Sequence, residues 1–116
     1  MANYWKLYKR AKTFYFSLEK IKCPALNGEE IIFDWRGFRH FLHKGRGKRS
    51  IPDQIRRFKL LFKIGNLIKN SELSNDKYTE TPFLPLFCED KNEIIKIVTM
   101  QDNSGKRFFI SIMNYP

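Results

Sequence analysis

The chain has 116 residues, enough for one domain with one hydrophobic core and too few for two. Hydrophobic residues make up 42% and aromatic residues 16%, which excludes a disordered basic tail and predicts a folded protein. The net charge of +10 favours a polyanionic partner such as nucleic acid, while an acidic protein, an anionic membrane surface or an inert basic surface would also agree with it.

The sequence has no pattern typical of a membrane-spanning segment or of a metal site. No run approaches the roughly 18 apolar residues that cross a bilayer, and the N-terminal segment lacks the apolar stretch of a signal peptide, so we expect a cytoplasmic protein without a membrane partner. Cys23 and Cys88 form no CxxC pair, and we expect both to be free thiols in or near the core. Neither has a His or Cys neighbour at zinc spacing, so the sequence predicts no metal and no cofactor.

The first third of the chain is predicted to hold a helix, a turn and a strand. Apolar residues recur at three- and four-residue spacing over residues 3–21, which is typical of an amphipathic helix, and Asn3 is a suitable N-cap. Pro24 and Gly28 favour a chain reversal between them. Residues 30–34 are expected to form a short strand.

A second, shorter helix is predicted to begin near Asp34. At about 100° per residue, three apolar side chains share one side of this helix and four basic ones share the other. Gly37 weakens the prediction at the helix start, because glycine costs about 1 kcal/mol relative to alanine. The apolar side comprises Phe38, Phe41 and Leu42, and the basic side comprises Arg36, His40, His43 and Lys44.

A basic loop and a long helix follow. Residues 45–49 read GRGKR, which predicts a flexible cationic loop. Ser50, with Asp53 three residues later, resembles a capping box, and the apolar repeat then predicts one helix to Asn70 whose apolar face can lie on a sheet. Residues 70–81 begin with several Asn and Ser and are expected to be the most mobile loop.

The last third is predicted to be a three-stranded antiparallel meander, because segments rich in Ile, Val and Phe alternate with short turns. Pro82 and Pro85 place the first strand at a sheet edge. The fold class is therefore α+β, a single domain over residues 1–116 with N-terminal helices packed on a mainly antiparallel sheet of about four strands. The predicted strands of the meander are residues 82–89, 93–101 and 106–114.

Alternation within the last two strands sorts their side chains between two faces. If the isoleucines mark the face covered by the long helix, Lys96 and Ser111 point to the open face, where a lysine and a hydroxyl can hold a phosphate. A surface lysine without a role is the alternative. The covered face is expected to comprise Ile95, Ile97, Thr99, Phe108, Ile110 and Ile112, and the open face to include Val98, Met100, Phe109 and Met113.

The segment 35–52 is the most informative one for function. It contains six Lys or Arg and no acidic residue, and both histidines of the chain lie within it. Cations without competing carboxylates suit the phosphates of RNA or DNA, and glycines let backbone amides approach phosphate oxygens. A solvated surface loop is the alternative. The candidate phosphate contacts are Arg36, Arg46, Lys48 and Arg49.

His40 and His43 are candidate catalytic side chains. Each has a cation about one helical turn away, and nearby positive charge keeps an imidazole neutral, as a general base near neutral pH requires. An exposed histidine without a role is the alternative for each. The chemistry they suit is metal-free cleavage of RNA, in which a 2′-hydroxyl attacks the adjacent phosphate with help from a base, an acid and cations.

Trp35 and Tyr115 are the candidates for stacking on RNA bases. Other aromatic residues near Lys and Arg follow the helical repeat, so we expect them in the core. Core packing is also the alternative for these two.

The order of elements resembles a known superfamily. The chain resembles the ribonucleases grouped as barnase, EndoU, colicin nuclease and RelE-like (BECR) proteins, especially their small phage-associated members. The resemblance lies in the order of a strand, the segment from Phe38 to Lys44, a basic loop, a long helix and a meander. The resemblance covers residues 30–115. It implies helices on a four-stranded antiparallel sheet and a metal-independent ribonuclease toxin, often held by an acidic antitoxin or immunity protein.

The same resemblance implies the members of the site. His40 with Lys44 would form its core, and a hydroxyl or cation from the last two strands would complete it, either Thr99, Lys96 or Ser111. We therefore expect a small RNA endonuclease. A non-catalytic RNA-binding module and a protein that binds an acidic partner through residues 36–49 are the alternatives.

Overall fold

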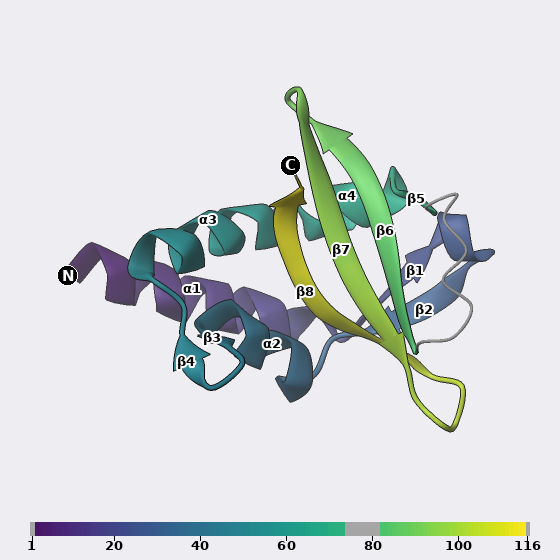
Figure 1. Cartoon of the computed structure of the whole chain (residues 1–116), viewed down its shortest axis with the longest axis horizontal. Helices are drawn as coiled ribbons and strands as arrows, with labels where there is room; N and C mark the ends of the chain where they lie inside the picture. Colours follow the sequence, from purple (N-terminus) through teal and green to yellow (C-terminus); the bar gives the residue numbers. More distant parts are fainter. Residues whose placement is uncertain (1, 74–81, 116) are drawn as a thin grey trace.

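The helical and strand segments build one curled sheet with helices packed on it. The computed structural model describes residues 2–73 and 82–115 (Figure 1). The predicted α+β class is confirmed, but the sheet within this part has six strands instead of about four. The elements are α1 (Ala2–Leu18), β1 (Lys20–Cys23), the 3-10 turn η1 (Pro24–Leu26), β2 (Glu29–Ile32), α2 (Trp35–Leu42), β3 (His43–Lys44), β4 (Gly47–Lys48), α3 (Ile51–Leu61), α4 (Ile64–Lys69), β5 (Glu72–Leu73), β6 (Phe83–Asp90), β7 (Glu93–Gln101) and β8 (Arg107–Tyr115).

The first helix ends earlier than its apolar repeat predicts. Glu19 has a positive φ of 57°, a left-handed conformation that stops a helix, and the chain then enters β1. Ile21 therefore belongs to a strand. Asn3 lies inside α1, so the prediction that it caps the helix is wrong.

The reversal predicted around Pro24 and Gly28 is confirmed. η1 begins at Pro24, and Asn27 and Gly28 both have positive φ, which turns the chain into β2. β1 and β2 pair antiparallel, and β2 runs parallel to the start of β8, with Ile32 opposite Phe108. This hairpin adds two strands to the meander and makes the sheet mixed.

The long helix predicted from Ser50 to Asn70 is two helices. Its start is confirmed, because the Asp53 amide donates to Ser50 Oγ over 3.3 Å. The chain then bends at Phe62 and Lys63, so that α3 packs on α1 and β8 while α4 packs on β1 and β6. The bend lets the chain follow the curved sheet (Figure 1). No helix in the described ranges is long and apolar enough to cross a membrane.

The three-stranded meander is confirmed, with strand order β1-β2-β8-β7-β6-β5. The prediction that β6 is an edge strand is wrong, because β5 pairs with it through Leu73 and Leu86. Pro85 precedes this paired stretch of β6. The predicted mobile loop lies for the most part at 74–81, outside the described residues.

A β-bulge between β7 and β8 changes the expected sorting of faces. Val98 pairs with Ser111 and Thr99 pairs with Phe109, so two residues of β8 span one step of β7. Phe109 therefore lies in the core, stacked 5.1 Å from the Phe33 ring, and the prediction that it faces away from the helices is wrong. Ile95, Ile97 and Thr99 are fully buried on the predicted face, and the free thiols Cys23 and Cys88 are buried in the core as predicted, at 0% and 6% exposure.

Candidate nucleic-acid interface

The second helix separates an apolar and a basic side, as predicted. The Asp34 carboxylate caps α2 by accepting from the Arg36 amide over 3.1 Å, and it also accepts from Arg36 Nε. Phe38 and Phe41 are buried, whereas His40 is half-buried. The cap and the apolar side together hold the basic side of α2 at the surface.

His43 and Lys44 lie beyond the helix, in a hairpin. β3 and β4 pair through His43 and Lys48, and Gly45 takes a positive φ of 59° in the turn between them. The predicted flexible loop is thus a two-stranded ribbon, and the predicted placement of His43 and Lys44 on the helical face of His40 is wrong. His43 instead lines a cavity of about 490 Å³ with Trp5.

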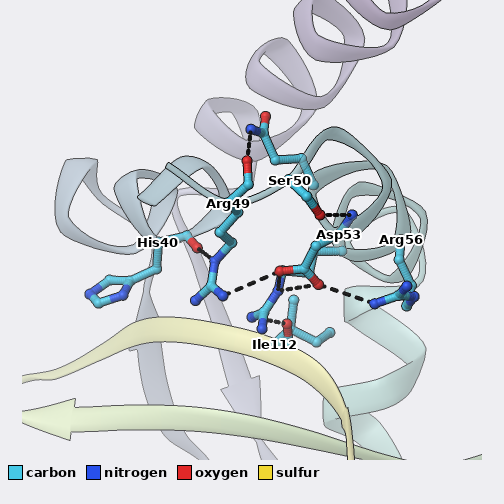
Figure 2. A network of polar contacts seen from close by, with 8 residues as sticks. His40, Arg49, Ser50, Asp53, Arg56 and Ile112 are labelled. Carbon is cyan, nitrogen blue, oxygen red and sulfur yellow. Dashed lines mark hydrogen bonds and ion pairs between the residues drawn. The ribbon is translucent and has the colours of Figure 1, made fainter. Parts of the chain in front are cut away.

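Asp53 is the centre of an arginine network (Figure 2). Its carboxylate lies 3.3 Å from Arg49 Nη1, 3.3 Å from Arg57 Nε and 3.2 Å from Arg56 Nη1. Arg49 and Arg57 are about nine-tenths buried at 9% and 11% exposure, while Arg56 is 59% exposed. Three guanidinium groups therefore share one carboxylate, which leaves a net positive charge at this place.

The two buried arginines also fasten three elements together. Arg49 Nε donates to the main-chain oxygen of His40 over 2.6 Å, and Arg57 Nη1 donates to that of Ile112 over 2.9 Å. These bonds join α2, α3 and β8 (Figure 2). Arg49, a predicted phosphate contact, therefore serves mainly to bind α2 to the start of α3. Asp53 and Arg57 are site residues that the sequence analysis does not predict, although their four-residue spacing is typical of a helical ion pair.

His40 has a lowered pKa. Burial is the largest cause, and the positive charges of Arg49, Arg39 and Arg57 act in the same direction. The imidazole is therefore neutral at pH 7. Figure 2 shows the ring pointing away from Asp53, with only the main-chain oxygen of His40 engaged by Arg49. A neutral imidazole beside fixed cations can accept a proton from a hydroxyl group of a bound, negatively charged ligand.

The predicted hydroxyl partners lie inside the protein. Thr99 is fully buried, and its Oγ1 donates to the Leu84 carbonyl and accepts from Arg107 Nη1, each over 3.0 Å. Ser111 is 8% exposed beside the bulge. The structure therefore does not bring Thr99 to the surface that holds His40.

The predicted stacking residues lie at two separate places. Trp35 is 61% exposed at the start of α2, where Arg36 lies 3.8 Å from the centre of the Phe108 ring. Tyr115 is 46% exposed at the end of β8, and Lys96 Nζ lies 5.4 Å from its ring centre.

Several cations are available for a ligand. In the part of the chain that the structure describes, the side chains of Arg39, Lys44, Arg46 and Lys48 are exposed and form no ion pair. They follow one another along α2 and the β3–β4 hairpin. We call this set, together with His40, the basic surface.

Comparison with known proteins adds no family. No family model, no curated protein and no solved structure matches this chain. Within residues 2–73 and 82–115, no group of three or more His, Cys, Asp or Glu side chains could hold a metal ion.

Proposed function

We propose that the protein is a small RNA endonuclease that uses His40 as its general base and requires no metal ion. The observation that carries the proposal is the position of His40, half-buried on α2 where Arg49 binds its main-chain oxygen; burial first, and then the charges of Arg49, Arg39 and Arg57, lower the pKa of its imidazole. A base must be unprotonated at the pH at which it works, and an anionic transition state needs cations held in place beforehand. Both requirements meet at His40.

The proposed reaction begins with proton transfer from an RNA 2′-hydroxyl to a ring nitrogen of His40. The 2′-oxygen attacks the adjacent phosphorus, and the extra negative charge of the phosphorane is stabilised by the neighbouring guanidinium groups. The bond to the 5′-oxygen then breaks, and that oxygen takes a proton from a neighbouring cation or from water. The products are a 2′,3′-cyclic phosphate and a free 5′-hydroxyl.

One observation favours a second candidate, a non-catalytic RNA-binding module. The Thr99 hydroxyl is buried and engaged twice, so it cannot serve as a partner of His40. The basic surface alone would still bind phosphates. An acidic antitoxin or immunity protein would bind the same surface and compete with RNA.

Binding should weaken steeply with salt, because each neutralised phosphate releases counterions. On single-stranded RNA the logarithm of the affinity should fall by about 0.7 per phosphate for each tenfold rise in salt. We expect the slope to become shallower by about 1.4 when Arg46 and Lys48 are both replaced by alanine. Fluorescence anisotropy with uncleavable 2′-O-methyl RNA measures this, and Lys69→Ala on α4 is the matched control. An affinity independent of salt would exclude RNA as the partner.

The pH profile of cleavage tests the role of His40. The rate should rise with pH as the imidazole loses its proton and reach half its plateau below 6.5, the ordinary pKa of histidine, because the folded pKa is lowered. The unfolded state binds this proton more readily, so the contribution of His40 to stability is present above pH 6.5 and declines as the pH falls below it. A half-maximal kcat/KM above pH 6.5 would contradict the assignment.

A further inference from the structure

An aromatic cavity lies where α1, the β3–β4 hairpin and the start of α3 meet. Its volume is about 490 Å³, within the range of about 300–1,000 Å³ that is usual for small-molecule sites. Each of the three elements forms one of its walls, and Figure 1 shows the hairpin beside the N-terminal half of α1. The residues that line the cavity include Tyr4, Trp5, Tyr8, His43, Lys48 and Gln54.

Contacts further along α1 show that Trp5 faces the hairpin. Phe16 follows Trp5 by eleven residues, so at about 100° per residue the two side chains lie within about 20° of each other around the helix. The Phe16 ring contacts Phe38 of α2, with 5.5 Å between the ring centres, and β3 directly follows α2. On the other side of α1, Phe14 contacts Phe62 instead. Trp5 therefore projects toward the wall that the hairpin forms.

The Trp5 ring is held by its own helix and still has open surface. Its centre lies 5.3 Å from that of Tyr4 and 5.6 Å from that of Tyr8, both in T-shaped arrangements. Tyr8 in turn packs against Phe38 and Phe58, which anchors the cluster to α2 and α3. Trp5 is nevertheless 56% exposed. Because neither tyrosine stacks on the indole, a flat ligand can do so.

The buried polar residue of this cavity is already engaged at both ends. Gln54 is 4% exposed, its Oε1 accepts from the Tyr4 hydroxyl, and its Nε2 donates to the Arg49 carbonyl over 2.9 Å. These bonds also fix α1 against the start of α3, so the cavity is formed before a ligand binds. A floor without a free hydrogen-bonding group accepts a flat ring without selecting one base over another.

The hairpin places a cation at the edge of the cavity. Lys48 pairs with His43 across the ladder, so the two side chains lie on the same face of the ribbon, and both residues line the cavity. Lys48 is exposed, and within residues 2–73 and 82–115 its ammonium group forms no ion pair. Because Lys48 also belongs to the basic surface, the cavity and that surface are continuous.

We infer that this cavity holds one unpaired base of an RNA strand, stacked on Trp5, while Lys48 binds a phosphate of the same strand. Aromatic surface beside a free cation matches the two parts of a nucleotide. The inference rests on the proposed function in that RNA is the ligand. It adds a preference for single strands, because a base within a duplex cannot enter the cavity. Trp5 then takes the stacking role that the sequence analysis gives to Trp35 and Tyr115.

Tryptophan fluorescence tests where the base stacks. The chain has two tryptophans, Trp5 and Trp35, and both are exposed, so each reports on a base that stacks on it. The probe is a 2′-O-methyl hexamer of uridine, which is not cleaved. It should quench Trp35→Phe, in which Trp5 is the remaining indole, and should bind Trp5→Phe without quenching Trp35. Polyphosphate, which has charge but no bases, and a fully paired 2′-O-methyl duplex should bind both variants without quenching.

Binding affinity gives the second measurement. Trp5→Ala should bind the hexamer about fivefold to a hundredfold more weakly than wild type, the usual effect of removing one stacking ring. Its affinity for polyphosphate should change by less than about twofold, because every cation remains. Phe16→Ala is the matched control, since Phe16 is a 42% exposed aromatic residue on the same side of α1 and does not line the cavity. Thermal unfolding confirms that each variant is folded.

Three results would overturn this inference while RNA binding at the basic surface stands. They are quenching of Trp35 in place of Trp5, quenching of Trp5 by polyphosphate or by the duplex as strongly as by the hexamer, and unchanged hexamer binding by folded Trp5→Ala. Failure of wild type to bind the hexamer at low salt would overturn the proposed function together with the inference. Quenching of Trp5 by a protein that leaves RNA uncut would support the inference and overturn only the endonuclease activity.

Discussion

Replacing His40 with alanine is expected to slow RNA cleavage by about a hundredfold to ten-thousandfold, the usual effect of removing a general base. The fold should tolerate the change to within about 0.5 kcal/mol, because the side chain is half-buried and the contact to Arg49 uses the main-chain oxygen, which alanine retains. RNA binding should persist, since the exposed cations of the basic surface remain. Single-turnover cleavage and anisotropy binding measure the two effects separately.

His43→Ala is the matched control for this experiment. His43 lies in the β3–β4 hairpin and lines a cavity with Trp5, whereas His40 lies in α2. We expect its replacement to change the rate by less than about tenfold, as for loss of a residue that performs no proton transfer. Equal losses for the two variants, or a larger loss for His43→Ala, would show that the base has been misassigned. Unfolding of His40→Ala would show that this histidine is a core residue.

Replacing Gly37 with alanine is expected to destabilise the protein by about 3 kcal/mol, a fall in Tm on the order of 10 °C. A Cβ at this position would lie 2.5 Å from the Phe109 carbonyl oxygen and 2.6 Å from its ring, and it would also collide with Tyr15 Oη. Both obstacles are held in place, because Tyr15 Oη donates to the Asp34 carbonyl over 2.6 Å and Phe109 belongs to the central sheet. The side chain therefore forces α2 away from β8.

Gly65→Ala is the control, because nothing lies within 4 Å of a Cβ added at this exposed position in α4. Alanine should stabilise the helix there by about 0.5–1 kcal/mol. Thermal and denaturant unfolding of both variants distinguish a packing requirement from a general intolerance of alanine. If Gly37→Ala were as stable as wild type, the close packing of α2 on β8, which positions His40, would be contradicted.

Local patterns in the sequence predicted the parts of the fold that depend on neighbouring residues. The Ser50 cap, the apolar side of α2 with Phe38 and Phe41, and the three strands of the meander all follow from spacing and turn residues. The end of α1 was missed because Glu19, a residue without a special preference, takes the left-handed conformation in place of a glycine.

Long-range contacts explain most of what could not be predicted. The bulge opposite Val98 is a feature of strand pairing, and no residue type in β8 indicates that Phe109 faces the helices. Asp53 and Arg57 are visible as a pair four residues apart, but the bond from Arg57 to the Ile112 carbonyl depends on the packing of α3 against β8. Gly37 is a weak helix residue by its type, whereas its lack of a side chain is what the packing requires.

Cleavage by the 2′-hydroxyl with His40 as base leaves characteristic chemical ends on the products, and these ends are the quantity to measure. Wild type is incubated with RNA in the presence of a chelator, and the fragments are analysed for their termini. We expect 2′,3′-cyclic phosphate and 5′-hydroxyl ends, with 2′-O-methyl RNA left intact. RNA that stays uncut, or fragments that carry 3′-hydroxyl ends, would contradict it.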